Sequence, residues 1–239
     1  AQRVARQHSG KRLIAELLLD CAACRRSVEA EPAAEARAIE ALRQEVRQRE
    51  QRCVEALLKL YAFRREDAHA NDLPLLDGRW GDDLFNPETL KLLGVRLGSG
   101  VAAGAAAGAG VDLLVGGLTL GAAALAGAIA GGALQTARSY GSRLMGKLKG
   151  KRELTVDDTV LRLLALRQQQ LLVALENRGH AAQHSILLGE LDEKAWRQGK
   201  LPEALVSARA HPQWSTLNPG AKVNQPQRQE QLDALAPQL

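Results

Sequence analysis

Two residue pairs in the chain have spacings that redox or metal sites use. Cys21 and Cys24 form a C-x-x-C pair, and His180 and His184 lie four residues apart, as two ligands on one helical face would. The cysteine pair lies on an apolar helical stripe, outside any βαβ context, and the histidines have neither an intervening glutamate nor an obvious third ligand. We therefore expect the cysteines to be buried as small hydrophobic residues, and we predict no metal site.

A third pattern has the spacing of a phosphate-binding loop. Gly141, Gly146 and Lys147 follow G-x-x-x-x-G-K, but Leu148 stands where a Ser or Thr hydroxyl would bind Mg²⁺, and no strand is predicted before the motif. Lys147 is better assigned to a basic segment described below. We predict no catalytic residue, no cofactor in this chain and no enzymatic activity.

A cluster of acidic and aromatic residues lies in a polar connector at residues 69–92, which Pro74, Gly78 and Gly81 mark as a loop. Its carboxylates have no nucleophile or base in view with which to do acid–base chemistry. Docking against a partner is the more specific interpretation, and an ordinary solvated loop is the alternative. The candidate docking residues are Asp77, Arg79, Trp80, Asp82, Asp83 and Phe85.

Composition narrows the fold. The chain has 239 residues, of which 46% are hydrophobic and only 3% aromatic, a poor basis for a β-sandwich or barrel. We predict an all-α helical bundle with a long N-terminal helical hairpin and a central Gly/Ala-rich hydrophobic hairpin. The net charge of +5 suits anionic partners. The arginines alternate with glutamates and lack an aromatic stacking platform, so nucleic acid is an unlikely partner. Three sparse cysteines indicate a reducing compartment.

Helical periodicity predicts the elements of the N-terminal part. Apolar residues recur every three or four positions over residues 11 to about 30, and again from Pro32 to about residue 65. Arg49 is the one misfit in the seam of the second helix. We expect an antiparallel helical hairpin over residues 1–68, with an intermolecular coiled coil, and hence an oligomer, as the alternative.

The rest of the chain divides by composition. A Gly/Ala-rich hairpin occupies residues 93–137, and a basic flank with C-terminal helices occupies 138–210. A helix is predicted to begin at the capping sequence Thr155-Val-Asp-Asp158, with shorter helices near 181–198 and 202–210. Residues 211–239, rich in Pro, Gln and Asn, are predicted to form an extended or loosely docked tail.

The segment from residue 97 to 134 contains a single charged residue, Asp112. Small residues recur in it at intervals of four, the pattern that lets helices pack closely in an apolar medium. Two helices of about 18 residues, bent at Gly116-Gly117, would each be nearly long enough to span hydrocarbon. The residues proposed for this membrane hairpin are Gly100, Gly104, Gly108, Asp112, Gly116, Gly117, Gly121, Leu125, Gly127 and Gly131.

Basic residues flank this hairpin on both sides, which places both of its ends on the cytoplasmic face of a membrane with anionic lipid. Asp112 could cancel most of the insertion energy of the first arm, so insertion is marginal. The alternative is that the hairpin stays buried permanently in a soluble bundle. The residues of the basic flank are Lys91, Arg96, Arg138, Arg143, Lys147, Lys149, Lys151 and Arg152.

The connector sequence from Asp77 to Leu90, the hairpin bend at residues 113–120 and the sequence from Arg152 to Asp158 together resemble a known bacterial arrangement. They are similar to the C-terminal domain of unknown function that follows the G domain in bacterial Era-like GTPases. The resemblance covers about residues 45–180. It implies an upstream G domain, which would hold GTP and Mg²⁺, and it supplies no catalytic residue for this chain.

Three functional hypotheses follow. The first is a non-catalytic, membrane-associating effector domain of a bacterial GTPase, cytoplasmic and peripheral to or inserted in the inner membrane. The second is a soluble partner-docking module with the hairpin as permanent core. The third is a pore-forming effector, which the absence of a signal-peptide pattern disfavours. Because the chain begins with Ala1 and has Met145 as its only methionine, we expect it to be processed or part of a longer protein.

Overall fold

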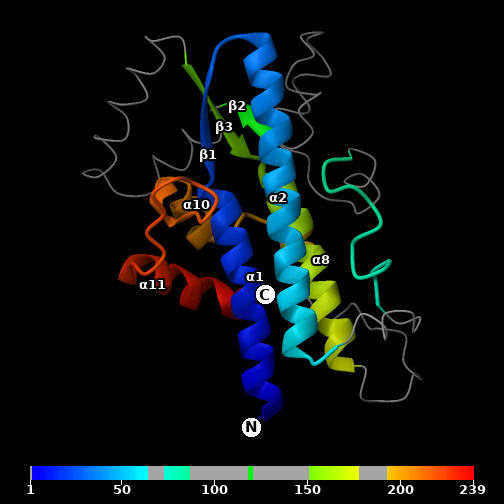
Figure 1. The fold of residues 1–239 in the computed structure, drawn as a ribbon. Coiled ribbons are helices and arrows are strands. Elements are labelled where there is room, and N and C mark those ends of the chain that lie inside the picture. Colours follow the sequence, from blue (N-terminus) through cyan, green and yellow to red (C-terminus); the bar gives the residue numbers. More distant parts are fainter. Residues whose placement is uncertain (1, 64–72, 87–117, 121–150, 178–192) are drawn as a thin grey trace.

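The computed structural model of the chain describes residues 2–63, 73–86, 118–120, 151–177 and 193–239. These residues are mostly helical, which confirms the prediction of a largely all-α fold (Figure 1). The helices are α1 (Gln2–Ala23), α2 (Pro32–Leu60), α8 (Asp158–Asn177), α9 (Glu193–Gln198), α10 (Glu203–Ala208) and α11 (Pro226–Leu235), with 3-10 turns η3 (Pro212–Trp214) and η4 (Ala236–Gln238).

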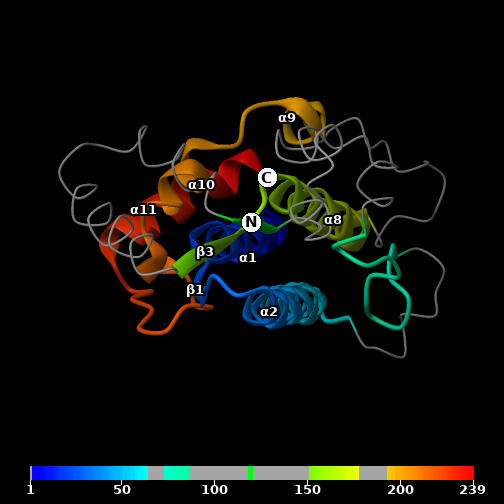
Figure 2. The same cartoon turned by 90° about the horizontal axis from the view of Figure 1, so that it is seen from above.

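Helix α1 is the central element. It packs against α2 and α8 on one side and against α10, α11 and the two 3-10 turns on the other (Figure 2). Its first five described residues are exposed, whereas from Ile14 to Ala23 every residue except Glu16 is buried. The sequence predicted that α1 buries one apolar stripe. The second half of α1 is instead buried on all sides, because neighbouring elements surround it.

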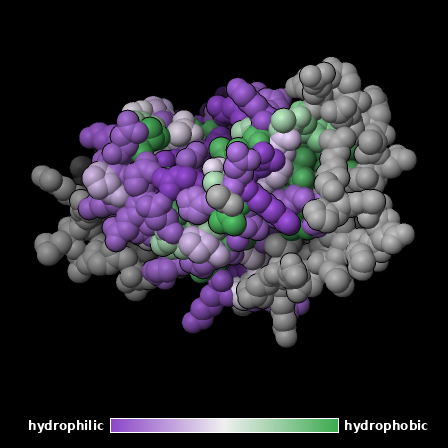
Figure 3. All heavy atoms as spheres, turned by 90° about the horizontal axis from the view of Figure 1, so that it is seen from below, coloured by the Kyte–Doolittle hydropathy of each residue, from purple (hydrophilic) through white to green (hydrophobic). Residues whose placement is uncertain are grey.

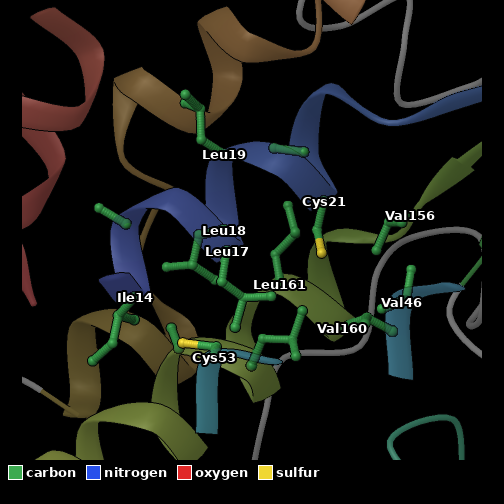
Figure 4. Packing of buried hydrophobic residues seen from close by; sticks show 14 of the residues in the cluster. Ile14, Leu17, Leu18, Leu19, Cys21, Val46, Cys53, Val156, Val160 and Leu161 are labelled. Carbon is green, nitrogen blue, oxygen red and sulfur yellow. The ribbon is translucent and has the colours of Figure 1, made fainter. Parts of the chain in front are cut away.

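The core joins α1, α2 and α8 through leucine, isoleucine and valine side chains (Figure 4). Ile14, Leu18 and Leu161 have no exposed surface. Gly10 marks a close approach of two helices, because a Cβ atom there would lie 2.7 Å from Leu172 Cδ1 on α8. The α1–α2 pair is antiparallel, as the hairpin prediction has it, but the connection between its helices is a strand (Figure 1).

A small antiparallel sheet was not predicted. Strands β1 (Arg25–Glu29), β2 (Leu118–Leu120) and β3 (Lys151–Val156) form it in the order β1-β3-β2. The prediction that the first helix continues to about residue 30 is wrong, because Arg25–Glu29 pair with β3 in the register Arg25↔Thr155 to Glu29↔Lys151. The pairing partner lies more than a hundred residues away, so local periodicity could not reveal it.

Strand β2 falls within the predicted hydrophobic hairpin. Leu118–Leu120 directly follow the expected bend and were predicted to begin a second helix, which is wrong for these three residues. They pair instead with β3, in the register Leu118↔Val156 to Leu120↔Leu154. An alternating Leu-Thr-Leu sequence after two glycines suits an edge strand as well as a helix start, and the adjacent β3 decides between them.

The predicted start of one helix is confirmed and that of another is shifted. Helix α2 begins at Pro32, with proline in its first turn. Helix α8 begins only at Asp158, because Thr155 and Val156 of the predicted capping box belong to β3. Asp157 caps α8, since its Oδ1 accepts a hydrogen bond from the Thr159 backbone N–H at 2.7 Å. The first short helix expected near 181–198 is described only from Glu193 to Gln198, and α10 lies within the expected 202–210.

The prediction of an extended or loosely docked C-terminal tail is wrong. Residues 211–239 form η3, α11 and η4, and these elements bury Trp214, Leu232 and Leu235 against α1 and α10. The larger apolar residues of this segment that are buried are Trp214, Leu232, Leu235 and Leu239.

Candidate functional site

The cysteines are buried and free, as predicted. Cys21, Cys24 and Cys53 form no disulfide, and burial raises the pKa of both Cys24 and Cys53 to about 12. Burial also raises the pKa of Cys21 well above its usual value. Thiols that stay protonated near neutral pH are poor nucleophiles and poor metal ligands. Within the described parts of the chain, no three His, Cys, Asp or Glu residues are grouped as a metal site would require.

Most of the proposed membrane-hairpin and basic-flank residues lie outside the described residues, as do the two histidines and the G-x-x-x-x-G-K sequence. Two residues of the basic flank are placed: Lys151 and Arg152 are the first residues of β3, opposite Glu29 and Val28 of β1. Among the helices that the structure describes, none is long and apolar enough to cross a membrane.

The connector is described over residues 73–86, which we call the docked segment. It lies beside α2 and α8 (Figure 1) and buries Leu75, Leu84 and Phe85 against the helical core. A tight turn brings Leu76 and Arg79 together in two backbone hydrogen bonds, with Gly78 at a φ of 73° that favours glycine. Three leucine or phenylalanine anchors therefore fix a segment that was predicted to be a polar loop.

Arginines of α2 hold one end of the docked segment. Arg47 donates through Nε and Nη2 to the two carboxylate oxygens of Asp83, at 2.9 and 3.2 Å. The guanidinium groups of Arg43 and Arg47 lie 5.6 and 5.1 Å from the centre of the Phe85 ring. Burial opposes ionisation of Asp83, but the hydrogen bonds and the charge of Arg47, together with the Phe85 backbone N–H and the charge of Arg43, outweigh burial and lower the pKa of Asp83 below its usual value.

Arg167 of α8 holds the middle of the docked segment. Its guanidinium carbon lies 5.3 Å from the centre of the Trp80 ring, and its Nη2 donates to the Asp82 carbonyl oxygen at 2.8 Å. The Arg167 side chain is only 5% exposed. A buried arginine that stacks on an aromatic ring and bonds a backbone carbonyl ties the docked segment to α8.

Glu50 lies beneath this contact. It is 6% exposed, its Oε2 lies 3.6 Å from Arg167 Nη1, and its Oε1 accepts a hydrogen bond from Gln168 Nε2 at 3.2 Å. Burial raises the pKa of Glu50 to about 7, against the opposing effects of Arg167 and Gln168. The carboxyl therefore changes charge near neutral pH, in contact with the arginine that holds the docked segment.

Sequence reasoning identified the loop but missed the residues beneath it. Trp80, Asp82, Asp83 and Phe85 were predicted to dock against a partner. In this structure they contact α2 and α8 of the same chain, whereas Asp77 and Arg79 are exposed. Glu50 and Arg167 were not singled out. One signal existed for Glu50: it is spaced four residues from Val46 and three from Cys53, on the face that α2 buries.

The raised pKa of Glu50 predicts that the stability of the chain depends on pH. Because the pKa of Glu50 is raised from 4.5 to about 7, its contribution to stability is fully present below about pH 4.5 and is lost as the pH rises through about 7. Between about pH 5.5 and 8.5, the free energy of unfolding of the unmodified chain should fall relative to that of Glu50→Gln, by on the order of 2–3 kcal/mol. Urea unfolding at several pH values measures this difference.

The matched control is Glu55→Gln on the same helix. The Glu55 side chain is exposed, so this variant should follow the pH dependence of the unmodified chain. Parallel stability curves for Glu50→Gln and the unmodified chain would contradict the assignment of a proton to Glu50.

The surface at the end where α1 begins is mostly hydrophilic over the described residues (Figure 3). Val4 and Leu76, at 68% and 72% exposed, are isolated rather than parts of an apolar patch on the described surface. The candidate site in the described parts of the chain is the junction of the docked segment with α2 and α8, where paired charges and aromatic rings meet a buried carboxyl.

Comparison of the chain with curated proteins and with solved structures gives no significant match. A family model described as "Domain of unknown function (DUF3482)" matches residues 1–237. That match spans the central helix, the sheet, the docked segment and the C-terminal helices. The chain therefore belongs to the family of the domain of unknown function DUF3482.

Proposed function

We propose that the chain is a non-catalytic helical effector domain that associates with anionic membrane lipid, at the cytoplasmic face of the inner membrane. The observation that carries the proposal is the segment 97–134, which has one charged residue, Asp112, between basic flanks. Such a segment can contact an apolar phase, while its flanks bind lipid headgroups. In this proposal an upstream G domain sets when the segment is available, by binding its two states with different affinity.

The described fold supports this proposal by the way it holds the segment. The docked segment precedes it, β3 follows it, and β2 attaches its middle to the edge of the sheet. A three-residue edge strand is a short pairing that can be exchanged at small cost.

The pairing of β2 with β3 also favours a second candidate, a soluble module in which the segment is permanent core. In that case the sheet and the docked segment would hold residues 87–150 to the helical body at all times. The two candidates differ in whether the apolar segment ever reaches lipid.

Flotation of the purified chain with liposomes distinguishes them. With liposomes that contain anionic lipid, we expect the chain to float and to resist both high salt and carbonate, because apolar contact is not screened by ions. Leu125→Lys should reduce flotation by at least tenfold, since a lysine near the centre of an apolar arm costs about 2.5–3.5 kcal/mol to bury in lipid.

The matched control is Leu76→Lys, the same change at a site that is 72% exposed on the docked segment. It should float as the unmodified chain does. Flotation that disappears in high salt would limit binding to the basic flanks. A monodisperse chain that does not float at all would contradict autonomous membrane association and favour the soluble module.

A further inference from the structure

We infer that the chain enters only one leaflet of a membrane, through two separate arms of the apolar segment, because β2 stays in the sheet between them. The inference rests on the proposed membrane association and sets the depth that this association reaches. It differs from the hairpin predicted from the sequence, in which two helices bent at Gly116-Gly117 each nearly span the hydrocarbon.

Three described elements hold the chain before, within and after the apolar segment. Phe85, near the end of the docked segment, is 4% exposed and packs in the helical core. Leu118–Leu120 pair with β3, and β3 itself begins at Lys151. We call the sequence between these points the first arm, residues 87–117, and the second arm, residues 121–150. Each arm therefore starts and ends at the same folded body.

Strand β3, which holds β2, is itself fixed. Its other edge pairs with β1, and Leu154 and Val156, the partners of Leu120 and Leu118, have no exposed surface. The β2 pairing is short, but entry of the arms into lipid does not require it to break, because almost all of the apolar sequence lies outside β2. Pairing also gives the β2 backbone hydrogen-bond partners that lipid cannot supply.

The length of each arm sets the depth that it can reach. An arm that leaves one body and returns to it must cross the bilayer twice if it crosses at all. Two helical crossings need about 40 residues and a turn, whereas each arm has about 30. An isolated pair of strands would leave backbone groups unpaired in hydrocarbon. Out and back as helices, an arm reaches about 20 Å, enough for one leaflet of about 15 Å but not for two.

The charge pattern of the second arm agrees with contact at one leaflet. Its first part, residues 121–134, has no charged residue, whereas its return carries Arg138, Arg143, Lys147 and Lys149. Four cations are costly in a helix that spans hydrocarbon. At the surface of a leaflet they can bind anionic headgroups while the apolar part enters the lipid.

A disulfide between β2 and β3 locks the pairing. Thr119 lies directly opposite Thr155, so Thr119→Cys with Thr155→Cys should form a disulfide when the purified chain is oxidised. The three native cysteines are buried and should stay reduced. The matched control is Thr119→Cys with Ser27→Cys, because Ser27 lies on β1, two strands from β2 and too far for a disulfide. Absence of the disulfide in the first variant would overturn the inference.

The locked chain is then floated with liposomes that contain anionic lipid. We expect the oxidised and reduced forms to float equally, because β2 keeps its place in both. Loss of flotation in the oxidised form alone, by tenfold or more, would overturn the inference and leave the proposed membrane association standing. Absence of flotation in both forms would instead contradict the proposed association, and the inference would fall with it.

A reductant that cannot cross the bilayer measures the depth. Ala122→Cys lies just after β2 and is labelled with the fluorophore NBD, while the native thiols, buried and with raised pKa values, react slowly. Dithionite added outside the liposomes should remove nearly all of the fluorescence, as it should for Ala36→Cys on the exposed face of α2. In a hairpin that spans the bilayer, residue 122 would lie in the far leaflet. Fluorescence that persists until detergent is added would overturn the inference.

Discussion

Replacing Asp20 by alanine is expected to lower the free energy of unfolding by about 3–5 kcal/mol, because it leaves buried arginine charges without a counterion. Asp20 has no exposed surface at the end of α1. Its Oδ2 accepts hydrogen bonds from Arg49 Nε at 2.7 Å and from Thr216 Oγ1 at 2.8 Å. Its Oδ1 accepts from the Thr216 backbone N–H at 2.9 Å and lies 3.3 Å from Arg228 Nη2.

This carboxylate joins three parts of the chain: α1 carries Asp20, α2 carries Arg49, and the C-terminal segment supplies Thr216 and Arg228. Urea unfolding of Asp20→Ala measures the loss. Asp233→Ala is the matched control, because Asp233 pairs with Arg12 at a surface where its side chain is 65% exposed. Exposed pairs contribute about 0–1 kcal/mol. Equal losses for the two variants would contradict the role of the buried cluster.

A double-mutant cycle separates the charge pair from the other contacts. Asp20→Ala combined with Arg228→Met removes an anion together with one of its cations. We expect the double variant to be less destabilised than the sum of the single variants, by at least about 1 kcal/mol. Additive losses would mean that Arg228 does not depend on Asp20.

The same cluster explains why Arg49 was a misfit in the predicted seam of α2. Periodicity correctly assigned Arg49 to the face of α2 that packs on α1. The Arg49 side chain forms an ion pair with Asp20 there instead of packing against apolar residues. Local pattern was sufficient for the existence of α1, α2 and α8 and for the start of α2. These features depend on residues within a few positions of one another.

Features that depend on distant residues were missed. Helix α1 ends at Ala23 because Asn218 holds both sides of the break: its Nδ2 donates to the Ala23 carbonyl oxygen at 3.0 Å, and its Oδ1 accepts from the Arg25 backbone N–H at 3.0 Å. Residues 25–29 then pair with β3. No local signal at residues 20–30 reports an asparagine nearly two hundred positions away.

In the candidate site, too, the features that depend on nearby residues were predicted and those that depend on distant residues were missed. The connector was recognised from its Trp, Asp and Gly residues, which are local signals. Its binding surface was not, because Glu50 and Arg167 lie on different helices and resemble other charged residues of a polar helix. Only the packing of α2 against α8 reveals that both are buried.

Trp214→Ala is the second substitution with a large expected effect, a loss of about 3–5 kcal/mol in the free energy of unfolding. Trp214 is only 2% exposed, stacks on the His211 ring with centroids 4.0 Å apart, and donates through Nε1 to Gln225 Oε1 at 2.9 Å. Its carbonyl oxygen also accepts from Arg228 Nε at 2.9 Å. Truncation would leave a cavity and loosen the residue that reaches Asp20.

The effect of Trp214→Ala on amide protection distinguishes a C-terminal segment that is part of the core from one that is loosely docked. If α11 is part of the core, Trp214→Ala should lower amide protection in α1 as well as in α11, and the chain should still unfold in one transition. Trp80→Ala is the matched control: its ring is half-buried at the edge of the fold, so the loss should be smaller and confined to residues 73–86. Loss of protection in residues 211–239 alone, with α1 unchanged, would mean that the C-terminal helices only rest on a core that is complete without them.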